Sequence, residues 1–235
     1  DAAERTADYN AGTGVAFADW DPTHGGVPFL SGYTKRKAIR YHTTLPASSL
    51  SDFPKLFSIT ADTNIAAELS SSNGVAVTET DGTTIAPFGL YPTSVPADGT
   101  LLMRAKFPTL LSSAALHDVL GYLYYDSTQT TSEDKAGVVD NGYVLFMPLE
   151  EDPSGGAPQM FDWVTETNVG TSAGTMTSGD LVAGQVGKGL DFDATDDSID
   201  CGTGPRPTAA LTVEFWSKID DLSNPYRGLV GADVG

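Results

Sequence analysis

The chain has 235 residues, of which 31 are Asp or Glu and 13 are Lys or Arg, so its net charge at pH 7 is −18. This balance excludes sequence-independent nucleic-acid binding, which needs a cationic surface, and it disfavours contact with anionic membranes. A hydrophobic content of 40% and a single cysteine, Cys201, exclude a fully disordered chain, an intrachain disulfide and a cysteine-based zinc site. No apolar run is long enough to cross a membrane.

The negative charge is concentrated in the second half of the chain. Residues 1–125 hold 12 acidic and 8 basic residues, whereas residues 126–235 hold 19 acidic and 5 basic residues. A shift of this size predicts two modules with different surfaces.

Residues 1–30 contain glycines and prolines but little alternation of apolar and polar residues. We interpret them as an extended N-terminal arm. Phe17, Trp20 and Phe29 favour an arm that packs against a surface, because large aromatic side chains need apolar area to cover.

Residues 31–126 are predicted to form a β-sandwich domain. Short runs rich in β-branched and aromatic residues alternate with turn-forming residues, and the best helix candidate is only residues 110–120. Asp81-Gly82 predicts a hairpin turn, and residues 50–54 predict a turn that leads into a strand. The expected strands are 37–43, 56–61, 74–79, 101–107 and 120–125.

Five motifs of this segment follow one another in a recognisable order: Tyr33 with Lys35-Arg36-Lys37 and Ile39, residues 50–54, residues 73–75 with 80–83, residues 104–108, and residues 123–125. In these motifs the segment resembles an uncharacterised β-sandwich domain of bacterial, archaeal and phage surface proteins. The family usually has Gly after the final pair of tyrosines, where this chain has Asp126, and the resemblance implies no catalytic residues.

Residues 127–142 are interpreted as a linker. Three motifs follow it, at residues 143–150, at residues 186–193 followed by 196–200, and at residues 211–218. In these motifs, residues 143–235 resemble a laminin-G-like, concanavalin A-like jelly roll. The predicted fold class is therefore all-β, with two β-sandwich, jelly-roll-like modules that follow the arm. Such jelly rolls are usually larger than the 93 residues present here, so we expect this module to be partial, completed by further sequence or by another chain.

Five carboxylates lie close together in the second module and are candidates for binding Ca²⁺, which prefers six to eight oxygen ligands. The alternative is a polar hairpin tip whose carboxylates face solvent. The pattern excludes an EF-hand loop. The five residues are Asp191, Asp193, Asp196, Asp197 and Asp200.

Hydrolysis of polysaccharides is a less favoured interpretation. Glycosidases need two carboxylates at a defined separation, and Glu150, Asp191 and Asp193 are the candidates here. No serine-nucleophile elbow or phosphate-binding loop is present. We therefore expect that this chain is not an enzyme.

Two other sets of residues are candidate binding surfaces. The basic residues Lys35, Arg36, Lys37 and Arg40, with Phe17 and Trp20 of the arm, could dock an acidic partner. A cationic edge strand that blocks further pairing is the alternative. A glycan site would use Trp163, Asn224, Tyr226 and Arg227, with Trp216 either a further candidate or a core residue.

The sequence therefore favours a non-enzymatic structural protein displayed outside the cell or on a virion, which assembles with copies of itself or with other structural chains. Strand addition at open sheet edges is the expected mechanism. The alternative is a carbohydrate-binding adhesion module, with or without Ca²⁺.

Overall fold

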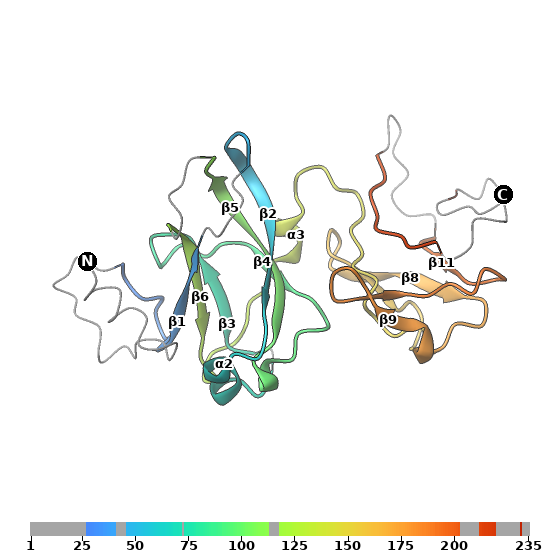
Figure 1. Ribbon diagram of the computed structural model, residues 1–235, viewed down its shortest axis with the longest axis horizontal. Helices are drawn as coiled ribbons and strands as arrows, with labels where there is room; N and C mark the ends of the chain where they lie inside the picture. The colour runs from blue at the N-terminus through green and yellow to red at the C-terminus, as the bar shows by residue number, and fades with distance from the viewer. Residues whose placement is uncertain are drawn as a thin grey trace. The chain divides into compact units, whose positions relative to one another are not determined.

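The computed structural model describes residues 27–40, 46–71, 73–112, 118–202, 212–219 and 231 (Figure 1). The described residues form two compact units. Unit 1 extends to Phe146 and includes Trp163–Glu166, and unit 2 consists of Met147–Asp162 and the residues from Thr167 onward. Both are built mainly from antiparallel strands, so the predicted all-β class is confirmed. Most of the predicted arm lies outside the described residues.

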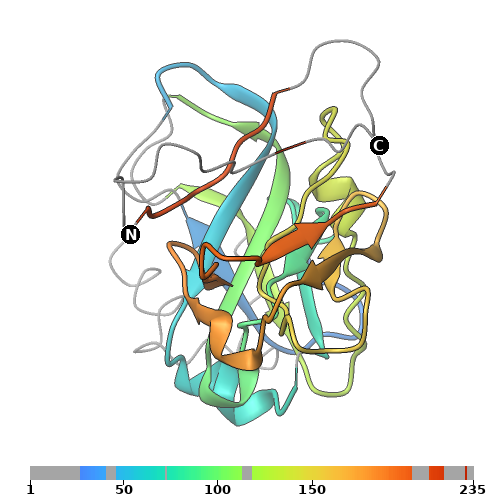
Figure 2. The same ribbon diagram turned by 90° about the vertical axis from the view of Figure 1, so that its right-hand side faces the viewer.

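Unit 1 contains two three-stranded antiparallel sheets. The first has the order β1-β6-β3, formed by β1 (Arg36–Arg40), β6 (Val119–Tyr125) and β3 (Val75–Thr78). The second has the order β2-β5-β4, formed by β2 (Leu50–Ile59), β5 (Leu101–Leu110) and β4 (Phe88–Leu90). Figures 1 and 2 show β2 and β5 side by side along their length, in agreement with their register from Leu50–Leu110 to Ile59–Leu101.

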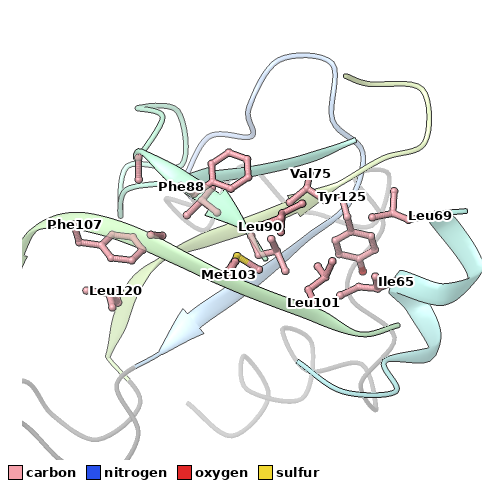
Figure 3. Close-up of a cluster of buried hydrophobic side chains, with 14 of the residues drawn as sticks. Ile65, Leu69, Val75, Phe88, Leu90, Leu101, Met103, Phe107, Leu120 and Tyr125 are labelled. Carbon is pink, nitrogen blue, oxygen red and sulfur yellow. The ribbon is translucent and has the colours of Figure 1, made fainter. Parts of the chain in front are cut away.

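The core of unit 1 lies between these sheets. Strand β5 shows why, because its side chains alternate between the two faces of the sheet. Leu101, Met103, Ala105 and Phe107 are buried, and the residues between them are less so. Figure 3 shows the cluster, to which the other sheet contributes Val75 and Tyr125. The sequence alternation therefore sets which face of β5 meets the opposite sheet.

Strand β2 is longer than predicted, because the residues expected to form a turn at its start belong to it. Pro54 is tolerated because β2 is an edge strand, where a missing backbone N–H need not cost a ladder hydrogen bond. The helix candidate at 110–120 has strand residues at both its ends, since β5 ends at Leu110 and β6 begins at Val119; residues 113–117 lie outside the described residues.

The Asp-Gly turn is present, as predicted, but its loop is longer than the two-residue type. The Glu79 N–H donates to Thr84 O, which leaves four residues in the loop. Gly82 has a φ of +75°, which its lack of a side chain allows. The Asp81 carboxylate accepts hydrogen bonds from the backbone of Thr83 and Thr84 and closes the loop.

A short helix, α2 (Thr63–Glu68), precedes β3 and was not predicted. The Asp62 carboxylate caps its start by accepting from the N–H groups of Asn64 and Ile65, both at 3.1 Å. Ile65 is buried in the core of unit 1. The other helical segments of the described residues are η4 (Pro96–Asp98), α3 (Lys135–Val138) and η5 (Ser178–Asp180).

Residues 127–142, which we expected to form a linker, are instead part of unit 1. Val138 of α3 and Val139 are buried. The Glu133 carboxylate accepts a hydrogen bond from the backbone N–H of Leu90 in β4. The segment is polar because some of its side chains, such as Glu133, accept hydrogen bonds from the edge of a sheet.

Unit 2 contains a sheet of order β11-β8-β7 and a ribbon of two strands. The sheet is formed by β7 (Met160–Asp162), β8 (Thr167–Ala173) and β11 (Ser198–Asp200), and the ribbon by β9 (Leu181–Ala183) and β10 (Lys188–Leu190). Among its described residues, Met160 is the one buried large apolar side chain.

Two predicted strands of the second module differ from the structure. Residues 143–149 form no strand, and the Phe146 carbonyl instead accepts from Trp163 N–H within unit 1. An apolar run without alternation does not specify a strand, and Pro148 interrupts it. Residues 212–219, most of another expected strand, are all exposed and carry no strand assignment.

The paired tyrosines at the end of β6 allow a test of the core. The Tyr125 hydroxyl is buried and has no hydrogen-bond partner among the described residues, and burial, with the charges of Asp62 and Glu68, raises its pKa to about 12. Figure 3 shows its side chain directed toward Ile65 and Leu101. The equally buried Tyr124 hydroxyl donates to Gly82 O at 2.9 Å and accepts from Arg36.

We expect Tyr125→Phe to leave the free energy of unfolding unchanged or to raise it by up to about 1 kcal/mol, since no hydrogen bond is lost. The matched variant Tyr124→Phe should lower it by about 1–2 kcal/mol. Urea denaturation measures both. A loss in Tyr125→Phe equal to that in Tyr124→Phe would show that the hydroxyl binds an ordered water.

Candidate functional site

Three of the five predicted metal-ligating aspartates come together in the turn between β10 and β11. Asp193, Asp196 and Asp197 each have a carboxylate oxygen within 4.8 Å of those of the other two. Asp191 and Asp200 lie outside this group, and Asp200 instead accepts a hydrogen bond from Gly202 N–H at 2.7 Å. The group offers three oxygen ligands, about half of what Ca²⁺ requires.

Hydrogen bonds within the turn fix two of these carboxylates. Asp193 accepts from the N–H of Thr195 at 2.7 Å, and this bond is the main cause that lowers the pKa of Asp193. Asp197 accepts from the N–H groups of Asp193 and Thr175. Ala194, between them, has a φ of +64°. The turn is thus held by its own acids, whereas the Asp196 carboxylate makes no hydrogen bond to another described residue.

This difference separates metal binding from loop structure. If the turn binds Ca²⁺, millimolar Ca²⁺ should raise the melting temperature of the chain relative to a chelator, since a ligand of the folded state stabilises it. Asp196→Ala should remove the increase and leave the melting temperature in chelator unchanged. Equal melting temperatures of the wild-type chain in Ca²⁺ and in chelator would refute the Ca²⁺ prediction.

The carboxylates that were candidates for hydrolysis differ in how deeply they are buried. Glu150 is 3% exposed, and its carboxylate accepts from the backbone N–H of Lys188 in β10 at 3.1 Å. Burial raises the pKa of the neighbouring Glu151. Asp191 and Asp193 are exposed. Glu150 therefore has a structural role in holding the β9–β10 ribbon.

The two lysines of the basic cluster are paired with carboxylates within unit 1, and docking of an acidic partner on the cluster stays a prediction. Lys35 forms an ion pair with Glu68, and Lys37 with Asp62 at 2.7 Å. Both carboxylates belong to α2 or its cap, so the two lysines fasten that helix to β1 and to the residue before it. Arg40 is exposed, and Phe17 and Trp20 lie outside the described residues.

Arg36 has the most contacts in this cluster. Its guanidinium carbon lies 4.2 Å from the ring centroids of both Phe29 and Tyr122. Its nitrogens donate to the carbonyl oxygens of Val27 and Pro28 at 3.0 and 2.8 Å. Hydrogen bonds and cation–π contacts of this kind stabilise a fold. Arg36 thus holds residues 27–29 against the sheet.

Trp163 does not form an exposed glycan platform, so that prediction is wrong. It is 1% exposed and packs against Tyr91 and Phe146, with ring centroids 5.2 and 5.3 Å away. A side chain at Gly89 would lie 2.9 Å from the Trp163 ring, so only glycine fits there. Trp216 is 85% exposed, and Asn224, Tyr226 and Arg227 lie outside the described residues.

Comparisons with protein-family models, with curated proteins and with solved structures found no match. The resemblances to surface-protein and jelly-roll families therefore rest on the quoted motifs alone. Among the described residues, no helix is long and apolar enough to span a membrane.

Sequence reasoning missed Asp126, the best-bound acid of unit 1. It is 3% exposed, and its carboxylate accepts four hydrogen bonds, from the N–H and hydroxyl groups of Thr34 and Thr128, at 2.6–3.1 Å. Burial alone would raise the pKa of Asp126, but these hydrogen bonds outweigh it and lower the pKa to about 2. The available signal was its position directly after Tyr125, where the resembling family has Gly.

A lowered pKa stabilises the folded state above the unfolded pKa, and this contribution is lost as pH falls through the folded pKa. Acidification from about pH 4 to pH 2 should therefore lower the free energy of unfolding of the wild-type chain by about 2 kcal/mol, because Asp126 takes up a proton. Asp126→Asn should be less stable than the wild-type chain at pH 7. On the same acidification, its free energy of unfolding should fall by about 2 kcal/mol less than that of the wild-type chain. Thermal unfolding across this range measures the difference.

Asp98→Asn is the control, since Asp98 is exposed and accepts one local hydrogen bond, from Thr100 N–H. It should follow the wild-type acid profile. If the stability of Asp126→Asn fell with pH as steeply as that of the wild-type chain, the loss could not be assigned to Asp126.

Proposed function

We propose that this chain is a non-enzymatic structural protein of an extracellular surface or a virion, and that it assembles with neighbouring copies. The observation that carries the proposal is the exposed segment 212–219. Phe215 is 52% exposed and Trp216 is 85% exposed. Large apolar side chains exposed together are typical of interaction surfaces, and Trp is common among the residues that dominate binding energy.

Two features of unit 1 support an assembly role over a catalytic one. The charged side chains of Arg36 and Asp126 each make several hydrogen bonds to other residues of unit 1, so both have a structural role. The edge strands β1 and β2 carry lysines or proline, which are devices against unwanted strand pairing. The edges at β1 and β2 are therefore disfavoured for pairing between copies, and we propose segment 212–219 as the contact instead.

The test compares the association of three full-length proteins by analytical ultracentrifugation. The wild-type chain should associate in a concentration-dependent way, and Phe215→Ser with Trp216→Ser should shift it to monomer. Ile85→Ser is the matched control, because Ile85 is 48% exposed in unit 1, and it should associate like the wild-type chain. A monomeric wild-type chain at all concentrations would refute assembly with copies of itself.

Carbohydrate binding is a second candidate, favoured by the exposure of Trp216, because an exposed aromatic ring offers an apolar face on which a sugar ring can stack. On this proposal, Trp216→Ala should remove binding to a glycan array and leave the melting temperature unchanged. The array is read with Ca²⁺ and with chelator, so that a requirement for the acidic turn is seen separately. An array without any wild-type binding would remove this candidate.

A further inference from the structure

The described residues contain four pairs in which Asn or Asp precedes Gly, namely Asn73-Gly74, Asp81-Gly82, Asp98-Gly99 and Asn141-Gly142. In such a pair the glycine nitrogen can attack the carbonyl carbon of the preceding side chain, because glycine has no side chain to obstruct the approach. A folded protein slows this attack when it holds either reacting group in a hydrogen bond, because that bond must break first. The four pairs therefore differ in reactivity according to their hydrogen bonds.

Three of the pairs are held at the attacking nitrogen. The N–H groups of Gly82, Gly99 and Gly142 donate to the carbonyl oxygens of Glu79, Pro96 and Asp140, at 3.1, 2.9 and 2.8 Å. Each therefore keeps its nitrogen in a backbone turn.

The side chains of the same three pairs are held as well. Asp81 accepts from Thr84 N–H at 2.8 Å, and Asp98 accepts from Thr100 N–H at 3.0 Å. The Asn141 amide donates to Asp52 O at 2.6 Å. Cyclisation at these pairs requires at least two hydrogen bonds to break first.

Asn73-Gly74 lacks both restraints. The Asn73 side chain is exposed, and within the described part of the chain neither its amide nor the Gly74 N–H has a hydrogen-bond partner. Among the described residues, the hydrogen bond of Asn73 is made by its backbone N–H, which donates to Ser71 Oγ at 3.3 Å. The pair lies in the turn that leads into β3, and Gly74 has a φ of +86°.

We propose that Asn73 is a site of spontaneous deamidation and isomerisation in the native protein, and that the fold protects Asn141. The Gly74 nitrogen gives its proton to hydroxide and bonds to Cγ of Asn73, and the side-chain nitrogen takes up a proton from water and leaves as ammonia. Water then adds to one of the two carbonyl groups of the cyclic imide and opens the ring. The product at position 73 is Asp or its isomer, in which the main chain passes through the side-chain carbon.

The position of Gly74 gives this modification a structural effect. A side chain added at Gly74 would lie 2.0 Å from the carbonyl oxygen of Asp126, so the two backbones are in close contact. The Gly74 carbonyl also accepts from Asp126 N–H at 2.9 Å. The isomer lengthens the main chain by one carbon at this contact, and both products add a negative charge. The modification should thus lower the melting temperature of the chain.

The experiment incubates the full chain at mildly alkaline pH and follows residues 73 and 141 by peptide mapping with mass spectrometry. In the native protein we expect Asn73 to convert at least about tenfold faster than Asn141, since hydrogen bonds must break only at Asn141. In urea the two should convert at similar rates. Asn73→Ser should remove most of the charge heterogeneity that develops with time, and Asn141→Ser should leave it unchanged.

Similar native rates at both positions, or a faster rate at Asn141, would overturn the proposal. So would an unmodified Asn73 in the native protein under conditions where both asparagines convert in urea. Because the readout is chemical, it is independent of whether the chain assembles or binds glycans.

Discussion

The arrangement of unit 1 depends on one strand with two different faces. β5 is hydrogen-bonded on both edges, to β2 and to β4, so its position fixes that of the whole sheet. Its inner face is apolar and meets the opposite sheet, which is the main source of stability in a sandwich. Its outer face carries Arg104 and Lys106, and these two residues set what covers the sheet on that side.

The outer face is covered by residues from both earlier and later positions in the chain. Arg104 donates to the Tyr91 hydroxyl at 2.6 Å and lies 5.1 Å from the Phe146 ring centroid, and Lys106 pairs with Asp140 at 2.6 Å. Trp163 fills the space above Gly89. Long basic side chains cover apolar surface with their methylene stems while the charged ends find partners. This explains why segments of polar composition, such as 127–142, belong to the folded unit.

Local signals in the sequence predicted the fold class, most strands of unit 1 and the turn at Gly82, because alternation and turn residues act over a few positions. The short helix α2 was beyond such reasoning, since six residues carry too little periodicity. The site residues depended on contacts distant in sequence. Lys35 meets Glu68 and Trp163 meets Tyr91 only after folding, so the sequence could not distinguish a free cation from a paired one. The acidic turn was local, and there three of the five predicted residues lie together, with Asp191 and Asp200 outside the group.

The hydrogen-bonded carboxylates also determine the order in which the chain takes up protons on acidification. Glu79 and Glu151 have raised pKa values because of burial, so they are neutralised early, and neutralisation removes charges that the fold disfavours. Lys35, Ser127 and the threonines around Asp126 hold the pKa values of Glu68 and Asp126 low, so the contacts that tie helix α2 and residues 34 and 128 to unit 1 persist. Protonation of Glu68 and Asp126 below the ordinary pKa range of carboxyl groups is therefore the step at which acid begins to weaken the contacts of unit 1.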